Sequence, residues 1–207
     1  MTTMTKAKLD SLTPDMAFDK LMKGNVRFQR NQMVTRDFKA QREETSGGQF
    51  PFATILSCID SRTSSEIIFD QGIGDLFNVR LAGNVINEDA LGSMEFACKV
   101  AGSKVIMILG HEACGAVKGA CDHVEMGNLT ALLSKISPAL ELEKEETQRD
   151  SSNPEFVRKV TEIHTKRMKD VLLEQSSVLR EMYEAKEIKI VCGIHELGSG
   201  IVRAIDH

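Results

Sequence analysis

Two short clusters in the sequence carry side chains that can bind a metal ion. The first cluster is CIDSR at residues 58–62, and the second is HEACG at residues 111–115. Cys58, His111 and Cys114 together offer two thiolates and one imidazole, a ligand set that zinc accepts in tetrahedral geometry. Three protein ligands leave the fourth position open, which distinguishes a catalytic zinc from a structural one.

Both clusters lie at the ends of predicted buried strands, over residues 52–59 and 104–110. These apolar runs are typical of parallel strands that helices cover on both faces. Reactive groups in an open α/β sheet collect where strands end. The two clusters therefore meet if these two strands are neighbours.

The residue pattern alone leaves a second interpretation open. A single cysteine in an apolar strand is usually a small hydrophobic residue, and one H-x-x-C motif is a weak signal. Asp60 and Arg62, two positions apart, more often form a loop ion pair than a catalytic device. Spacing by itself does not decide between a metal site and a chance arrangement.

The alternation of strands and helices predicts an α/β fold with a mostly parallel central β-sheet flanked by helices. Residues 36–49 are polar and are predicted to form a linker. The remaining strands are predicted over 75–81, 188–195 and, at the sheet edge, 201–205. The predicted helices cover 14–29, 88–100, a short segment after Cys114, 129–148 with an interruption at Pro138, and 154–185.

The first part of the chain is predicted to be an N-terminal helical arm, residues 1–35, followed by one zinc-binding α/β domain, residues 36–207. Thr13 and Pro14 are suited to the N-cap and first turn of the arm's amphipathic helix. This helix has no obvious position within its own chain, so we expect it to pack on a partner subunit.

Composition excludes several classes of function. The chain has 207 residues and a net charge of −4, so it presents no basic field for nucleic acid or anionic lipid. No uncharged apolar run approaches the roughly 18 residues needed to span a bilayer. Five cysteines in a chain of this length favour a reducing compartment over a disulfide framework. We therefore expect a cytoplasmic protein without nucleic-acid or membrane partners.

The two clusters and their surroundings resemble the β-class carbonic anhydrases. That family carries C-x-D-S-R on its first core strand and H-x-x-C-G later in the chain, as this sequence does. The likeness extends through LTPDMAFDKLMKGNVRF (12–28), EIIFDQGIGDLFNVRLAGN (66–84) and LGHEACGAVKGA (109–120). The resemblance implies reversible hydration of carbon dioxide to bicarbonate and a proton, with one Zn²⁺ per chain and zinc-bound hydroxide as the nucleophile.

The resemblance also assigns roles to residues of the first cluster and of the second. It implies that Cys58, His111 and Cys114 hold the zinc, that Asp60 orients the nucleophile, and that Arg62 keeps Asp60 ionised and turned away from the metal.

Some members of the family have an inactive resting state in which the aspartate becomes the fourth zinc ligand, so Asp60 is also a candidate ligand. The members with this switch carry a tryptophan where this chain has Ile55. We therefore expect an open site near neutral pH.

Substrate contacts and partners follow from the same resemblance. Gln49 matches a substrate-facing glutamine of the family, the backbone N–H of Gly115 is a second donor, and Ser61 orients the loop. The ligands implied are carbon dioxide and bicarbonate. The usual assembly of the family is a homodimer or homotetramer with active sites at the subunit interface.

Three other functions are compatible with these residues. The same zinc site could hydrolyse carbon disulfide or carbonyl sulfide, or the chain could be a non-catalytic zinc-binding module, favoured if Asp60 closes the coordination shell. A thiol hydrolase built on Cys58 and His111 would leave Cys114 without a role. Two departures from the family pattern are noted: Glu112 is expected to point to solvent, and His195 to be a structural histidine with satisfied hydrogen bonds.

Overall fold

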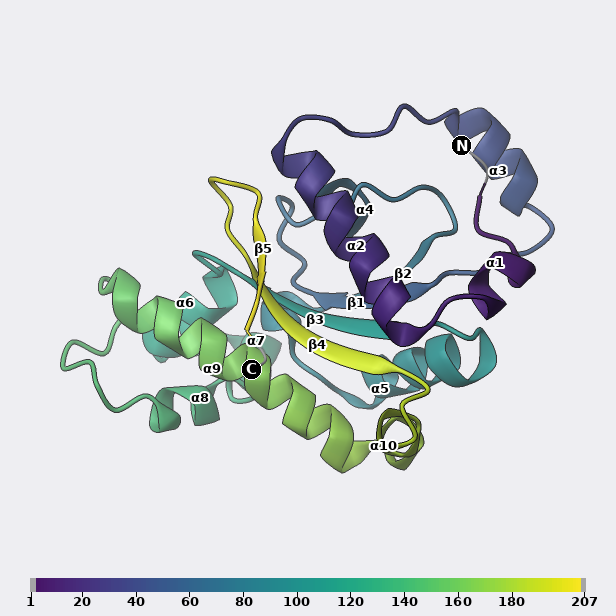
Figure 1. Ribbon diagram of the computed structural model, residues 1–207. Coiled ribbons are helices and arrows are strands. Elements are labelled where there is room, and N and C mark those ends of the chain that lie inside the picture. Colours follow the sequence, from purple (N-terminus) through teal and green to yellow (C-terminus); the bar gives the residue numbers. More distant parts are fainter. Residues whose placement is uncertain (1–2, 206–207) are drawn as a thin grey trace.

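The computed structural model describes residues 3–205 and contains one five-stranded sheet of order β2-β1-β3-β4-β5 (Figure 1). The first four strands pair in parallel, and β5 pairs antiparallel with β4. The predicted α/β fold with a mostly parallel central sheet is therefore confirmed. The strands are β1 (Ala53–Ser57), β2 (Leu76–Arg80), β3 (Val105–His111), β4 (Lys189–His195) and β5 (Val202–Ala204).

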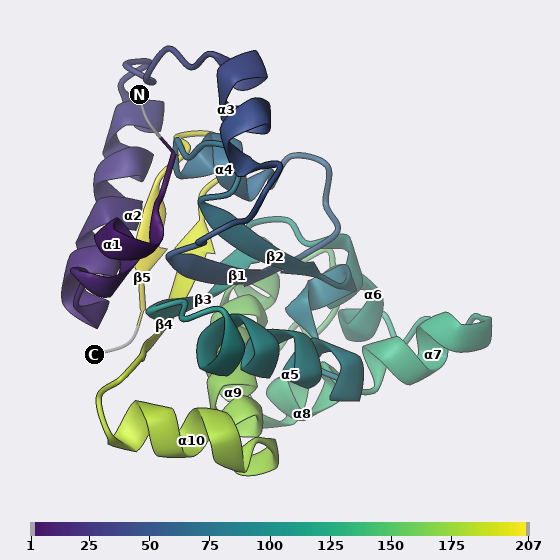
Figure 2. The same ribbon diagram turned by 90° about the vertical axis from the view of Figure 1, so that its right-hand side faces the viewer.

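Helices cover both faces of this sheet. In Figures 1 and 2, α2 lies on one face, and α5, α9 and α10 lie on the other. The helices are α1 (Lys6–Asp10), α2 (Pro14–Gln29), α3 (Phe38–Thr45), α4 (Ser65–Ile68), α5 (Glu88–Glu95), α6 (Gly115–Cys121), α7 (Gly127–Leu133), α8 (Ser137–Leu142), α9 (Pro154–Gln175) and α10 (Ser177–Glu184), with a 3₁₀ turn η1 (Ala82–Asn84) and a π-helical turn η2 (Phe96–Val100).

The arm helix has a position within its own chain, so the premise that it lacks one is wrong. Ala17 and Leu21 of α2 are fully buried in a core cluster with strand residues such as Ile55 and Met107. Burial of these side chains against the sheet removes the need for a partner to cover them. The division into an arm and a domain, and a contact of the arm with a partner, stay predictions.

The structure differs from the prediction in three segments, 36–49, 129–148 and 154–185, and in each of them a polar side chain begins or ends a helix. Residues 36–49 are not only a linker, since Asp37 caps α3 through the N–H of Ala40 at 3.0 Å. The long helix predicted over 154–185 is interrupted at Ser176, whose hydroxyl caps α10.

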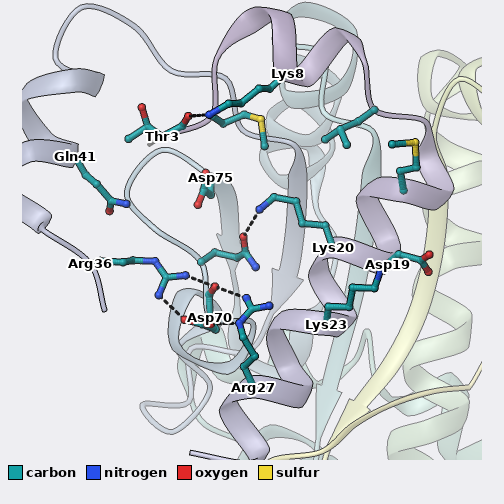
Figure 3. Close-up of a pocket in the computed structure, with 14 residues that line it drawn as sticks. Thr3, Lys8, Asp19, Lys20, Lys23, Arg27, Arg36, Gln41, Asp70 and Asp75 are labelled. Carbon is teal, nitrogen blue, oxygen red and sulfur yellow. Dashed lines mark hydrogen bonds and ion pairs between the residues drawn. The ribbon is translucent and has the colours of Figure 1, made fainter. Parts of the chain in front are cut away.

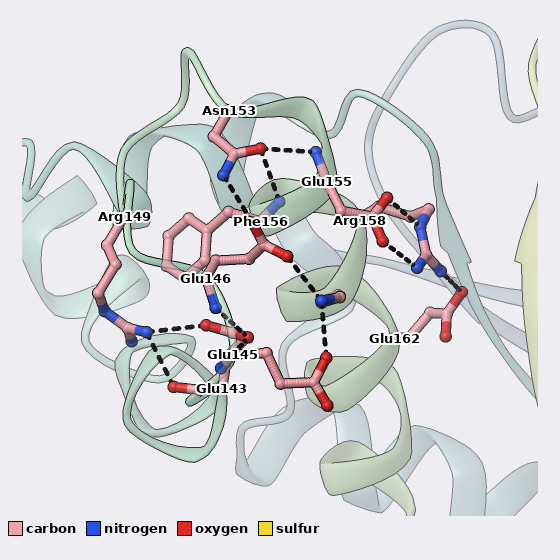
Figure 4. Close-up of polar contacts among 10 residues, drawn as sticks. Glu143, Glu145, Glu146, Arg149, Asn153, Glu155, Phe156, Arg158 and Glu162 are labelled. Atoms are coloured by element: carbon pink, nitrogen blue, oxygen red, sulfur yellow. Dashed lines mark hydrogen bonds and ion pairs between the residues drawn. The ribbon is translucent and has the colours of Figure 1, made fainter.

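The helix predicted to reach residue 148 ends at Leu142. Glu143, whose side chain is only 2% exposed, turns back to accept hydrogen bonds from the N–H groups of Glu145 and Glu146 (Figure 4). Arg149 completes this loop by binding the Glu143 carboxylate at 2.8 Å and packing over the ring of Phe156. Local hydrogen bonds to the buried Glu143 carboxylate therefore replace helix hydrogen bonds in this segment.

Within residues 3–205, no helix combines the length and the apolar character needed to cross a membrane.

Candidate metal centre

The two sequence clusters meet because β1 and β3 are adjacent parallel strands. Their register pairs Ser57 with Leu109, so Cys58 and His111 emerge at the same end of the sheet. The ligand atoms of Cys58, His111 and Cys114 lie within 4.8 Å of one another, and all three residues are buried. The structure thus brings together the three residues that the sequence predicts as a zinc-binding set.

His111 is prepared to bind a metal through one ring nitrogen. Its Nδ1 lies 2.8 Å from the carbonyl oxygen of Glu112, which can only accept, so Nδ1 carries the proton. The other nitrogen, Nε2, is buried and has no hydrogen-bond partner among the described residues. A buried lone pair without a donor is the form in which imidazole coordinates zinc.

The two thiols share one buried site and cannot both ionise without a cation. Their sulfur atoms are 4.0 Å apart. The hydrogen bond with Cys114 holds the pKa of Cys58 well below its usual range, and the N–H of Gly83 adds to this effect. The resulting thiolate, together with burial, raises the pKa of Cys114. A divalent ion that binds both sulfurs removes this conflict, so the donor set fits zinc.

Gly83 is a supporting residue that the sequence reasoning missed. Its N–H lies 3.3 Å from Cys58 Sγ, and its carbonyl accepts a 2.8 Å hydrogen bond from Nε2 of the buried His164 on α9. A φ of 65° explains why glycine stands here, and a Cβ would lie 2.8 Å from Ile136 Cδ1. The hydrogen bond from His164 on α9 therefore fixes the turn at Gly83, and the N–H of this turn donates to Cys58 Sγ.

The loop after Cys58 holds its two charged residues as a pair. Arg62 Nε and its second guanidinium nitrogen lie 2.9 and 2.7 Å from the two carboxylate oxygens of Asp60, and the Arg62 N–H also donates to Asp60 at 2.9 Å. These hydrogen bonds from Arg62 hold the pKa of Asp60 below its usual range. Asp60 is therefore a carboxylate engaged with Arg62, and it is not one of the three grouped ligands.

Arg80 anchors the same loop from the end of β2. Its Nε donates to the carbonyl of Cys58 at 3.0 Å, and a terminal nitrogen donates to the carbonyl of Asp60 at 2.6 Å. These bonds fix the backbone on both sides of Ile59. The strand pairing of Ser57 with Arg80 is the signal that could have found this contact.

The residues predicted to bind substrate are all exposed. Gln49 lies in the loop before β1, Ser61 follows Asp60, and Gly115 begins α6. A Cβ added to Gly115 would meet open space, so its backbone is accessible from solvent. Their contacts with a substrate stay predictions.

Glu112 and His195 differ from expectation. The Glu112 carboxylate accepts a 3.0 Å hydrogen bond from the N–H of Leu197, so this exposed residue ties the metal loop to the β4–β5 turn instead of pointing only to solvent. His195 is 3% exposed, and neither ring nitrogen has a partner among the described residues, so the expected satisfied histidine is wrong. Burial lowers the pKa of His195 to about 4, which keeps the ring neutral.

A mostly parallel α/β sheet with a buried Cys-His-Cys set at its strand ends fits a zinc site with three protein ligands. The family model described as carbonic anhydrase matches residues 53–202. A curated relative, carbonic anhydrase 2 of Mycobacterium tuberculosis, is 33% identical over 96% of both chains. The chain belongs to the β-class carbonic anhydrase family.

Solved structures support the same fold. A β-carbonic anhydrase of Aspergillus fumigatus has a TM-score of 0.71 at 24% identity, with 93% of this chain and 90% of that chain covered. One of two tetrameric β-carbonic anhydrases of Sordaria macrospora has a TM-score of 0.70 at 19% identity, covering 93% and 95%. A further curated relative, a carbonic anhydrase of Mycolicibacterium smegmatis, is 36% identical over 61% of this chain and 65% of its own length.

Proposed function

We propose that this protein catalyses the reversible hydration of carbon dioxide to bicarbonate and a proton. The observation that carries the proposal is the buried grouping of Cys58, His111 and Cys114 within a chain of this family. A zinc ion held by these three residues would supply a hydroxide nucleophile at neutral pH, because zinc lowers the pKa of a bound water from roughly 15.7 to about 7.

The protein's own residues orient the reactants. The Asp60 carboxylate accepts a hydrogen bond from the O–H of the attacking nucleophile and so directs a lone pair at the substrate carbon. Arg62 binds both Asp60 oxygens and keeps the carboxylate ionised and turned away from the three ligands. This contact supports an open site, with Asp60 acting in catalysis and not as a fourth ligand.

Two exposed groups are proposed to contact the substrate, and a third to orient the catalytic loop. The side-chain amide of Gln49 and the N–H of Gly115 can each donate to an oxygen of bicarbonate. Ser61 lies between Asp60 and Arg62 and is proposed to orient their loop. Arg80 contributes indirectly, because it fixes the carbonyls of this loop.

Stopped-flow measurement of carbon dioxide hydration, with metal analysis of the same samples, tests this proposal. We expect the wild type to contain about one zinc per chain and to be active. Arg62→Ala should lower kcat/KM by about 10–100-fold at unchanged zinc content, because Asp60 loses the partner that orients it.

An exposed arginine away from the site provides the control. Arg42→Ala, on α3, should retain wild-type activity. A wild type with one zinc per chain but without hydration activity at any pH would contradict the proposed function. Equal activity of the Arg62 and Arg42 variants would contradict the role of the Asp60–Arg62 pair.

The other functions considered from the sequence gain no support. Every relative and solved structure cited above is named a carbonic anhydrase. The Asp60–Arg62 pair argues against the closed, non-catalytic zinc module, since that module needs Asp60 at the metal. No contact among residues 3–205 favours carbon disulfide or carbonyl sulfide as substrate, or a thiol hydrolase.

We propose that the protein is cytoplasmic and that it forms a homodimer or a homotetramer. All five cysteines are unpaired and buried, which supports a reducing compartment. The strand β2 is a sheet edge, and its half-buried Phe77 forms an apolar ring pair with the 53%-exposed Phe96 of η2. An unpaired edge with an exposed aromatic ring supports coverage by a second copy of the chain.

Sedimentation velocity tests this interface. Phe96→Glu should shift the protein toward the monomer, because it places a charge in the apolar contact. Met126→Glu, at an exposed apolar residue of the α6–α7 connection, should leave the assembly unchanged. A Phe96 variant that sediments as the wild type would exclude the β2 edge as the contact.

A further inference from the structure

A second pocket lies between the arm and the loop that connects α4 with β2, and it shares no lining residue with the metal centre. Its volume is about 480 Å³, within the range of small-molecule sites. Figure 3 shows the pocket with its charged side chains. Five cationic residues and three carboxylates line it: Lys8, Lys20, Lys23, Arg27, Arg36, Asp19, Asp70 and Asp75. The pocket is therefore net positive in a chain of net charge −4.

Two of these carboxylates are already engaged within the protein. Asp70 is completely buried and is bound by both Arg27 and Arg36, which approach it from two sides in Figure 3. Asp75 accepts a 2.8 Å hydrogen bond from the N–H of Gly72. The carboxylates therefore do not neutralise the whole cationic lining.

Lys20 is a partly buried cation without a direct ion pair among residues 3–205. Its ammonium nitrogen lies 3.2 Å from Gln71 Oε1 and 4.7 Å from the ring centroid of Phe52, so both of these close contacts are with neutral groups. Burial lowers the pKa of Lys20, while Asp75 raises it. A mostly buried ammonium with neutral contacts is stabilised further when an anion approaches it.

Gln41 supplies a second donor at the same pocket. This residue of α3 is only 4% exposed, and its Oε1 accepts a 3.1 Å hydrogen bond from the N–H of Ile73. The side-chain amide of Gln41 lines the cavity, and its N–H groups can donate to a polar ligand there.

We propose that this pocket binds a phosphate group, held by Lys20 and Gln41 in the field of Arg27 and Arg36. A phosphate offers several acceptor oxygens to ammonium, guanidinium and amide donors at once, and charge-assisted hydrogen bonds of this kind are strong. The phosphate neutralises the net positive charge of the lining, while the ion pairs of Asp70 with Arg27 and Arg36 stay in place.

Part of the pocket lining is apolar. Met4, Leu12 and Met16 belong to it, and Met16 is half exposed. These side chains can contact an organic group attached to the phosphate. The ligand class is therefore a small phosphate ester, with free inorganic phosphate as the other source of the same chemistry.

Calorimetric titration of the zinc-loaded full chain, at constant ionic strength, tests the site with inorganic phosphate and with phenyl phosphate. Lys20→Met should weaken binding of both anions at least tenfold, because the methionine keeps the stem against Phe52 but removes the charge. Lys23→Met removes the charge of an exposed lysine in the same pocket and leaves the contacts of Lys20 intact. This variant should weaken binding several-fold. Lys39→Met, on the exposed face of α3, is the matched control and should bind as the wild type.

Activity separates this site from the metal centre, where anions can also bind. Both pocket variants should retain wild-type carbon dioxide hydration while they lose phosphate affinity. Tighter binding of phenyl phosphate would support an ester, and equal binding would support free phosphate. If the Lys20 and Lys23 variants bind both anions as the Lys39 variant does, the pocket is not a phosphate site, whatever the enzyme's activity.

Discussion

Replacing His111 by alanine is expected to reduce the zinc content from about one ion per chain to near zero and to abolish hydration activity. The imidazole Nε2 is the only nitrogen donor of the grouped set, and it is held in its coordinating form by the hydrogen bond at Nδ1. Two cysteines alone do not complete a catalytic zinc site. The loss of activity should exceed the roughly 10–100-fold effect of removing a supporting residue such as Arg62.

A buried cysteine outside the site provides the matched control for this variant. Cys121 on α6 lies in the same core cluster as Cys58 and Cys114, and burial raises the pKa of its thiol to about 11. Cys121→Ser should keep both zinc and activity, with only a loss of stability. Metal analysis and stopped-flow assays on both variants, after circular dichroism shows that each is folded, distinguish the outcomes. Zinc bound normally by the His111 variant would disprove the ligand assignment.

The grouping of Cys58, His111 and Cys114 could be predicted because their chemistry is local. Cysteine and histidine at the ends of apolar strands are visible in the sequence, and strand adjacency was the only structural fact still needed. The supporting contacts are different in kind. Arg80 binds the carbonyl of Cys58 because of the β1–β2 register, and His164 reaches Gly83 across 81 residues of sequence. Backbone carbonyls leave no signal in residue types, so residue types alone could not predict these contacts, and the Arg80 contact follows only once the β1–β2 register is known.

The predicted helix boundaries were wrong for a related physical reason. Ser176 and Asp37 can either cap a helix or lie in a loop, and tertiary packing selects between these roles. Glu143 in a charged segment would normally be solvated, but Arg149 allows it to be buried. The phosphate pocket likewise depends on tertiary structure, because Lys20 and Gln41 come from separate helices.

Asp70→Asn is expected to lower the free energy of unfolding at pH 7 by about 3 kcal/mol, because it leaves two arginines without their buried counter-charge. The Asp70 side chain is fully buried against Arg27 and Arg36, and it also accepts hydrogen bonds from the N–H of Val34 at 3.3 Å. Its φ of 46° lies in the left-handed region that asparagine tolerates as well as aspartate. The substitution therefore tests charge and not backbone strain.

The same carboxyl should make stability depend on pH in a defined direction. Burial raises the pKa of Asp70, but the hydrogen bonds from Arg27 and Arg36 outweigh it, so the folded-state pKa lies below the usual value. Stabilisation by Asp70 is therefore complete above the unfolded pKa of about 3.9 and is lost as the pH falls through the lower folded-state value. Urea unfolding between pH 7 and pH 3 should show a steeper loss for the wild type than for Asp70→Asn.

An exposed ion pair gives the comparison that isolates the effect of burial. Asp10 pairs with Lys6 one turn away on α1, and both side chains are more than half exposed. Asp10→Asn should change the free energy of unfolding by only about 0.3–0.5 kcal/mol, because water and salt screen the pair. Similar losses in the two variants would mean that the arginines around Asp70 find other partners when its charge is removed. A much larger loss of unfolding free energy for Asp70→Asn would show that the ion pairs of Asp70 with Arg27 and Arg36 hold α2 and the segment after it against the end of α4.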